Sequence, residues 1–262
     1  MFTINPFSQL SGLVSPLAMQ LYVILMVLLV AGGTILDVIH KQSAKYFFKN
    51  AEKAKTRATR SVSGAEKVSI AVQTIAVDVL ASGEFCNQRR RVAHLLTMYG
   101  FILFAATTAI MIFGYADSAT PATLPLLWHL GALMLCGGGY WFWFYIRVDV
   151  AAEGNPWYRV IPADLFVLSL LATATFALIW SFFQAVGATG LSRFFFVLFI
   201  FASTVLFGSV LWSKFAHMFF KPAAAFQKRV AKADGSRDGL PPPADKPKQF
   251  GLGIKRLLPK NY

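Results

Sequence analysis

The chain contains little negative charge and almost no cysteine. Its 262 residues include 12 Asp and Glu against 25 Lys and Arg, and charged residues of both signs make up only 14%. An average soluble domain carries about 25% charged residues, so this composition argues against an ordinary soluble enzyme. Cys86 and Cys136 are the only cysteines and form no Cys-x-x-C pair. The chain by itself therefore offers no ligand set for an iron–sulfur cluster and no attachment motif for a c-type haem.

Long stretches of the chain contain no Asp, Glu, Lys or Arg at all. These uncharged stretches are residues 1–36, 92–116, 118–146, 165–192 and 194–213. Each reaches the roughly 20 apolar residues that a membrane-spanning helix needs. None shows the alternation of a barrel strand, and lipid does not tolerate unpaired backbone groups. We therefore predict an all-α integral membrane protein, a five-helix bundle with spans near residues 17–37, 95–115, 123–146, 164–186 and 194–216.

The basic residues are distributed unevenly between the connections. Segment 38–93 carries 11, the segment from Lys214 onward carries 11, and Arg147 and Arg159 follow the third span, which leaves only Arg193 on the other side. Cytoplasmic connections carry the excess of Lys and Arg, so we predict the N-terminus outside and the C-terminus in the cytoplasm. The net charge of +13 then suits anionic lipid or an acidic soluble partner. No recognition motif accompanies it, so nucleic acid is not an expected partner.

The chain divides into a bundle, residues 1–222, and a basic, Pro-rich cytoplasmic tail, residues 223–262. The end of this tail, Phe250–Tyr262, is either disordered or a peptide that docks on a soluble subunit. Within the bundle, an amphipathic helix at about 64–82 is expected to lie in the membrane interface. Its apolar residues at helical spacing are Val68, Ala71, Val72, Ile75, Ala76, Val79 and Leu80.

Two of the four histidines are expected at similar depth on the cytoplasmic side. His94 follows three arginines at the start of the second span, and His217 lies 24 residues after Arg193, roughly 36 Å along one continuous helix. Imidazoles from two facing helices can take both axial positions of a haem iron. Alternatively, both are interfacial histidines bonded to backbone or headgroups. The basic residues placed to neutralise haem propionates are Arg90, Arg91 and Lys214.

The other two histidines and one carboxylate leave further alternatives open. His129 lies about two turns into the third span, where it either bonds a quinone carbonyl or packs against a neighbouring helix. His40, at the inner end of the first span, is either a quinone or haem-edge contact or an interfacial histidine. Asp164 opens the fourth span, where it either favours the helix dipole or delivers protons to a quinone.

Two stretches resemble a known family of membrane cytochromes. The stretch from Asp78–Leu80 through Arg90–Arg91 to His94–Phe101 is similar to the entry of the second helix in nitrate-reductase gamma-subunit-like cytochromes b. Trp212–Met218, followed by Lys221–Pro222, resembles the end of the fifth helix, particularly in quinone-interacting anchors of sulfur metabolism. Both stretches contain a family haem-ligand position, so the resemblance implies that His94 and His217 are the axial ligands.

Departures from the family pattern narrow this expectation. Two-haem members have further histidines deeper in the second helix and earlier in the fifth, but residues 100–113 and 194–210 contain none. The resemblance therefore implies one b-type haem. The iron–sulfur domain fused to some relatives is also missing from this sequence. A five-helix chain with a basic, Pro-rich tail is most similar to the membrane anchor of dissimilatory adenylylsulfate reductase.

The resemblance implies a multi-pass subunit of the bacterial inner membrane. It would relay electrons between a soluble cytoplasmic iron–sulfur/flavin oxidoreductase and quinone, as a non-catalytic or quinone-reducing subunit without catalytic residues of its own. A haem-free scaffold that only docks the soluble enzyme is the first alternative. The second is a small solute transporter, for which Gly137–Gly139 is the single broken-helix feature, and close helix packing explains that run better.

Overall fold

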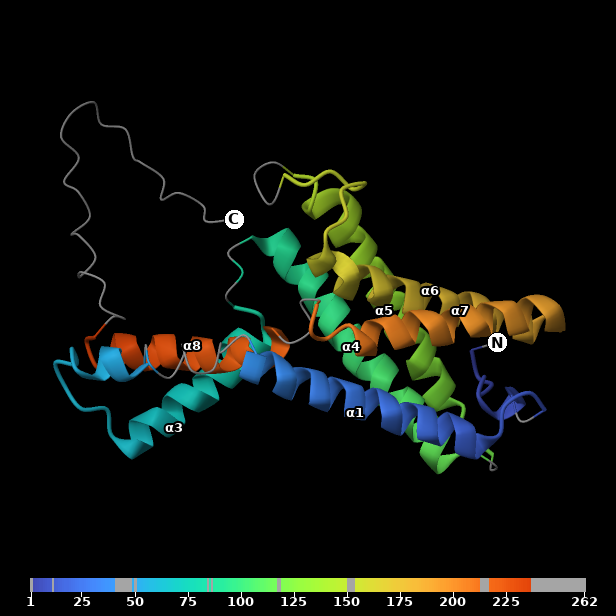
Figure 1. Ribbon diagram of the computed structural model, residues 1–262, viewed down its shortest axis with the longest axis horizontal. Coiled ribbons are helices and arrows are strands. Elements are labelled where there is room, and N and C mark those ends of the chain that lie inside the picture. Colours follow the sequence, from blue (N-terminus) through green and yellow to red (C-terminus); the bar gives the residue numbers. More distant parts are fainter. Residues whose placement is uncertain are drawn as a thin grey trace. The chain divides into compact units, whose positions relative to one another are not determined.

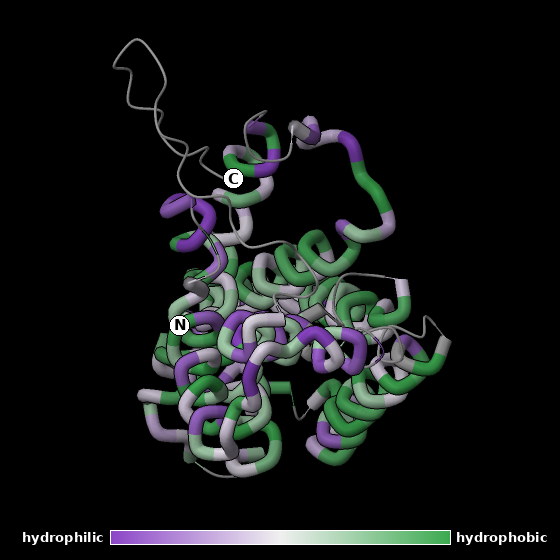
Figure 2. Tube along the Cα trace, turned by 90° about the vertical axis from the view of Figure 1, so that its left-hand side faces the viewer, coloured by the Kyte–Doolittle hydropathy of each residue, from purple (hydrophilic) through white to green (hydrophobic). Residues whose placement is uncertain are grey.

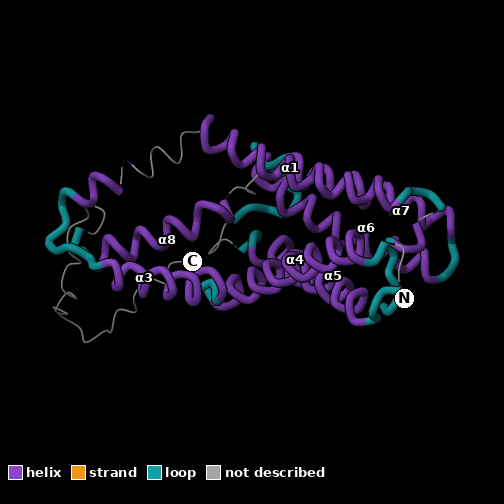
Figure 3. Tube along the Cα trace, turned by 90° about the horizontal axis from the view of Figure 1, so that it is seen from below, coloured by secondary structure: helices purple, strands orange, loops and turns teal. Residues whose placement is uncertain are grey.

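The computed structural model describes residues 2–10, 12–40, 49, 51–83, 85, 87–116, 119–149, 154–212 and 217–236. All regular structure in these segments is helical, which confirms the all-α prediction for them (Figure 3). The chain forms two compact units. The first comprises residues 1–37 and 89–216, and the second comprises residues 38–88 and 217–262.

Four helices among the described residues are long and apolar enough to cross a membrane, as predicted for a multi-pass membrane protein. They correspond to the first, second, fourth and fifth predicted spans. Stretches of hydrophobic residues run through the helices of the chain (Figure 2). The helices are α1 (Pro16–His40), α4 (Gln88–Gly114), α6 (Leu165–Ala185, preceded by the 3-10 turn η4, Pro162–Asp164) and α7 (Thr189–Gly208).

The third predicted span is also helical, but its composition differs from that of the four. It forms α5 (Thr123–Trp141) and the π-helical turn η3 (Phe142–Ile146). Pro125, His129 and a run of glycines interrupt the apolar sequence of α5. Its buried residues show that one face of α5 packs against the rest of the first unit. A fifth membrane crossing therefore stays a prediction.

Glycines allow α4 and α5 to pack backbone against backbone. A Cβ atom on Gly138 would lie 2.6 Å from the carbonyl oxygen of Ala93, and one on Gly131 would lie 2.7 Å from the amide nitrogen of Phe104. From the other helix, a Cβ on Gly100 would lie 2.8 Å from the amide nitrogen of Leu135. Small residues permit this approach in membrane helices. Close packing thus accounts for Gly138.

Aromatic rings fill the core of the first unit, where α6 and α7 run side by side (Figure 1). Trp180 of α6 stacks on Phe199 of α7, with ring centroids 5.6 Å apart, and Trp128 of α5 stacks on Phe104 of α4 at 5.1 Å. The Phe7 ring contacts Trp128 edge-on at 5.8 Å and Trp180 edge-on at 5.3 Å. The N-terminal segment is therefore part of this core.

Polar contacts attach the N-terminal segment to one end of the first unit. The amide of Asn5, which is buried, donates to the hydroxyl of Thr120 at 2.9 Å, and Gln184 donates to the carbonyl of Pro6 at 3.0 Å. The segment, the α4–α5 connection and the end of α6 therefore lie together. Such a common end is what alternating membrane crossings require of these segments.

Only one face of α1 is packed. Gln20 donates to the carbonyl of Ile112 in α4, and the Tyr22 hydroxyl donates to the carbonyl of Ile200 in α7. The apolar side chains on its other faces are exposed, which suits contact with lipid. These residues include Leu17, Leu21, Ile24, Leu25, Val27, Leu28, Ile35 and Leu36.

The second unit is built from α3 (Gly64–Gln73), the π-helical turn η2 (Thr74–Leu80) and α8 (His217–Ala233). Ser63 caps α3 by accepting from the amide of Glu66. Arg229 of α8 donates hydrogen bonds to both carboxylate oxygens of Asp78, at 2.6 and 3.0 Å. Because these bonds join segments 151 residues apart, they hold α8 on η2.

Helix α8 differs from the sequence prediction in two ways. It runs through the boundary drawn at residue 222, so residues 223–233 are helical rather than tail. It is also separate from α7, which ends at Gly208 instead of continuing to residue 216. The predicted interfacial helix agrees better, because residues 64–80 are helical with Val68, Val72 and Ile75 exposed. The predicted tail beyond residue 236 lies outside the described residues.

Replacing Gly138 with alanine should destabilise the protein, because the new methyl group would meet the backbone of Ala93 and the hydroxyl of Thr97. Overpacking of this kind costs about 1–3 kcal/mol. Gly137→Ala is the matched control, since a Cβ there has nothing within 4 Å, and helix propensity favours alanine by up to about 1 kcal/mol. Thermal unfolding in detergent should show a lower Tm for G138A than for the wild type and no such decrease for G137A. Equal Tm values for the two variants would contradict the α4–α5 contact.

The Arg60 guanidinium bonds both carboxylate oxygens of Glu66, at 3.0 and 2.5 Å, and this lowers the pKa of Glu66. The pair therefore stabilises the second unit above the ordinary Glu pKa, and this contribution is lost as pH falls through the lowered value. Arg60→Gln should raise the Glu66 pKa toward about 4.3, measured by carboxyl NMR titration. Lys67→Gln serves as the control, and an unchanged pKa in R60Q would refute the assignment.

Candidate functional site

His94 lies on a face of α4 that is turned toward the end of α7. It is half-buried, one turn after Arg90 and Arg91. Phe101, seven residues later, lies on the same face because seven residues make nearly two helical turns. The Phe101 ring contacts that of Phe207, with centroids 6.5 Å apart. The face that bears His94 is thereby directed toward the helix end from which the chain continues to His217.

His217 is the first residue of α8, and its side chain lies outside the described residues. It follows the end of α7 by nine residues, so the premise of one continuous helix from Arg193 to His217 is wrong. The two histidines also belong to different compact units. Their pairing on one haem iron therefore stays a prediction. The Lys214 position and the His40 side chain likewise lie outside the described residues.

The described residues near His94 fit one edge of a haem. Arg90 and Arg91 are partly exposed in the first turn of α4, where guanidinium groups can reach propionates. Met98 and Phe101 continue the half-buried stripe that begins at His94. An imidazole ligand, cationic groups and an apolar face are the protein contributions that a b-type haem needs.

His129 is fully buried, and both of its ring nitrogens have partners. Nδ1 lies 2.7 Å from the carbonyl oxygen of Pro125, and Nε2 lies 2.8 Å from the hydroxyl of Ser181 in α6. Because a carbonyl only accepts, Nδ1 carries the proton and Ser181 donates to Nε2. The ring of Phe2 covers the imidazole edge-on at 5.0 Å. These contacts are those of a packing histidine, and a quinone contact would have to displace the Ser181 hydroxyl.

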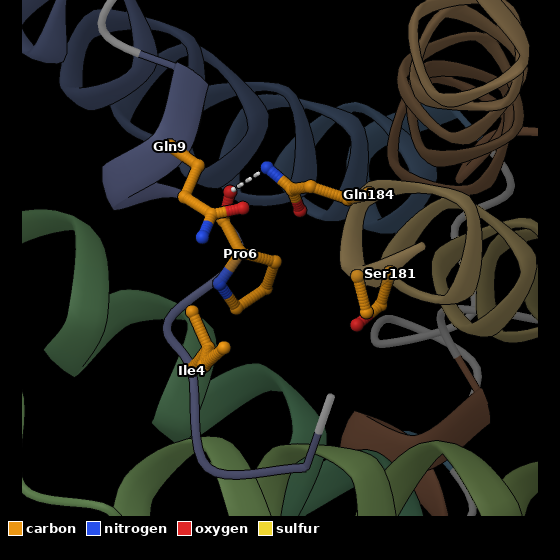
Figure 4. A pocket seen from close by; sticks show the side chains of 6 residues that line it. Ile4, Pro6, Gln9, Ser181 and Gln184 are labelled. Atoms are coloured by element: carbon orange, nitrogen blue, oxygen red, sulfur yellow. Dashed lines mark hydrogen bonds between the residues drawn. The ribbon is translucent and has the colours of Figure 1, made fainter. Parts of the chain in front are cut away.

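Two small pockets lie beside the N-terminal segment. The first, of about 10 Å³, is shown in Figure 4, where Gln184 bonds to Pro6 across its rim. The second, of about 20 Å³, lies between Phe7, Met19 and Met111. Volumes of this size hold a single water molecule, so neither pocket accommodates a quinone ring.

Arg147 and Asp164 form a buried ion pair between the end of η3 and the start of α6. Their side chains are 2% and 12% exposed, and Nη2 lies 2.5 Å from Oδ2. Arg147 also donates to the carbonyls of Pro156 and Arg159, at 3.1 and 2.7 Å, and its guanidinium lies 4.1 Å from the ring centroid of Trp143. The guanidinium therefore has acceptors on three residues and an aromatic face beside it.

The sequence interpretation of these two residues missed their pairing. Arg147 counted only as a cytoplasmic charge, and Asp164 as a helix-terminal carboxylate or proton donor. The carboxylate instead pairs with Arg147 and accepts the amide of Ile161 at 3.0 Å. A lone arginine ending one uncharged stretch and a lone aspartate beginning the next was the signal for this pair.

No protein-family model, no curated protein and no solved structure matches this chain.

Removing either member of the Arg147–Asp164 pair should destabilise the first unit by about 3–5 kcal/mol, because the remaining charge stays buried without its partner. The double variant R147Q/D164N should cost clearly less than the sum of R147Q and D164N. Thermal unfolding in detergent measures the cycle, with Arg159→Gln, an exposed neighbour, expected within about 0.5 kcal/mol of the wild type. Strict additivity would refute the coupling.

Proposed function

We propose that this chain is the membrane-anchor subunit of a redox complex. It passes electrons between a cytoplasmic iron–sulfur/flavin enzyme and the quinone pool of a bacterial inner membrane. The sequence resemblance identifies that enzyme as adenylylsulfate reductase. The proposed topology has five crossings, with α5 as the third and the N-terminus outside. The four apolar helices and the common location of the N-terminal segment and the α4–α5 connection support this topology.

The observation that carries the haem proposal is the contact between Phe101 and Phe207. It directs the His94 face of α4 toward the end of α7, and the chain reaches His217 nine residues after that end. His94 and His217 would hold one b-type haem, with Arg90, Arg91 and Lys214 neutralising its propionates. The iron of such a haem accepts and releases single electrons. His40 is the residue proposed for quinone contact. His129, whose ring nitrogens are bonded to Pro125 and Ser181, would contact a quinone only by releasing the Ser181 hydroxyl.

The second unit supplies the proposed docking surface for the soluble enzyme. Two of its carboxylates, Glu66 and Asp78, form ion pairs with Arg60 and Arg229 within the unit. Exposed cations therefore dominate its surface and suit an acidic partner. These exposed residues are Lys53, Lys55, Arg57, Lys67, Lys228 and Lys232.

A haem-free anchor is the second candidate function. It is favoured by one observation, namely that His217 begins a helix separate from α7 instead of ending the fifth span. In this case the chain would hold the soluble enzyme at the membrane while quinone approaches the enzyme's own cluster.

The reduced-minus-oxidised visible spectrum of the detergent-purified protein separates the two candidates. A b-type spectrum is expected in the wild type, with loss of bound haem in His94→Ala and His217→Ala because each removes an axial ligand. His129→Gln, which changes a packing histidine, should retain the spectrum. Folded wild-type protein without haem, despite haem supply during expression, would reject the cytochrome proposal and leave the anchor.

A further inference from the structure

The buried Arg147 guanidinium holds a tight turn by the two residues at its ends. It donates to the carbonyls of Pro156 and Arg159, which flank Trp157 and Tyr158. The amide of Arg159 also donates to the carbonyl of Pro156 at 3.0 Å. This bond from the fourth residue to the first defines a β-turn with the two aromatic residues at its centre.

The two aromatic side chains at this turn point away from the protein core. Trp157 is 56% exposed and Tyr158 is 71% exposed, with their rings edge-to-face at 5.7 Å. The Trp157 ring also contacts Phe144 at 6.4 Å, and Phe144 stacks on Tyr140 of α5 at 6.0 Å. A ladder of aromatic rings therefore runs from α5 onto the turn.

The position of the turn along the chain indicates what covers it. Trp157 lies five residues before Pro162, where the apolar segment of α6 begins. Residues this close to the end of a membrane-spanning helix lie at the lipid headgroups, where Trp and Tyr are enriched because their rings are apolar and their tips polar. Val160 and Ile161 are exposed between the turn and the helix. The apolar surface is thus continuous with the surface of α6.

We propose that the Pro156–Arg159 turn is an interfacial anchor that inserts Trp157 and Tyr158 into the headgroup layer of the bilayer. The Arg147–Asp164 pair is its positioning device, because it fixes the backbone on both sides of the aromatic pair and so reduces the entropy lost on insertion. The anchor sets the depth at which the α5–α6 connection lies.

Tryptophan fluorescence quenching in reconstituted vesicles tests this anchor. The wild-type minus W157F difference isolates the emission of Trp157, and brominated lipids with shallow or deep bromines report its depth. We expect stronger quenching by shallow than by deep bromines, and weak quenching by aqueous acrylamide. The wild-type minus W180F difference is the control, because Trp180 is fully buried and should resist acrylamide in detergent and in vesicles alike.

A set of charge variants tests the positioning role. R147Q/D164N, which removes both charges together, should weaken the preference of Trp157 for shallow bromines and shift its emission to the red. R159Q, which leaves the buried pair intact, should retain the aromatic depth. Ready quenching of Trp157 by acrylamide with none by bromolipid would overturn the proposal. So would protection from acrylamide only after a soluble partner is added, which would make the turn a protein-docking site.

Discussion

Backbone contact between α4 and α5 positions the functional features of the first unit. Gly131 and Gly138 let α5 approach so closely that a methyl group would not fit. One face of α5 is thereby buried against the rest of the unit, with His129 near one end of the helix and Arg147 just beyond the other. The same contact directs a neighbouring face of α4, which bears His94 and Phe101, toward α7.

Charge is handled differently in the two units. In the first, the buried guanidinium of Arg147 is matched by one carboxylate, two carbonyls and an aromatic face, as burial of a charge demands. In the second, Asp78 and Glu66 are used to hold helices and turns together, which leaves lysines to dominate the exposed surface. The first arrangement rigidifies a connection, and the second leaves cations available for a partner.

The errors of sequence interpretation have identifiable causes. The fifth predicted span extends to residue 216 because residues 209–213 are uncharged. In the structure, α7 ends at Gly208 and the chain turns through Ser209–Trp212. The predicted tail begins at residue 223 because the composition becomes polar there. In the structure, α8 continues to Ala233, and the hydrogen bond from Arg229 to Asp78 holds this part of the helix. Composition reports burial in lipid or core, whereas these boundaries depend on a turn and on a partner 151 residues away.

Helical secondary structure and the four apolar helices followed from the sequence alone, because uncharged runs of this length are stable in lipid only as helices. So did the amphipathic character of residues 64–80, since helical periodicity is a local property. Tertiary structure decided which polar residues meet. The Ser181 hydroxyl on His129, Asp164 on Arg147, and the turn that displays Trp157 all depend on contacts between separate segments. Periodicity along one helix carries no information about the register of its neighbour, so only the folded chain determines these pairs.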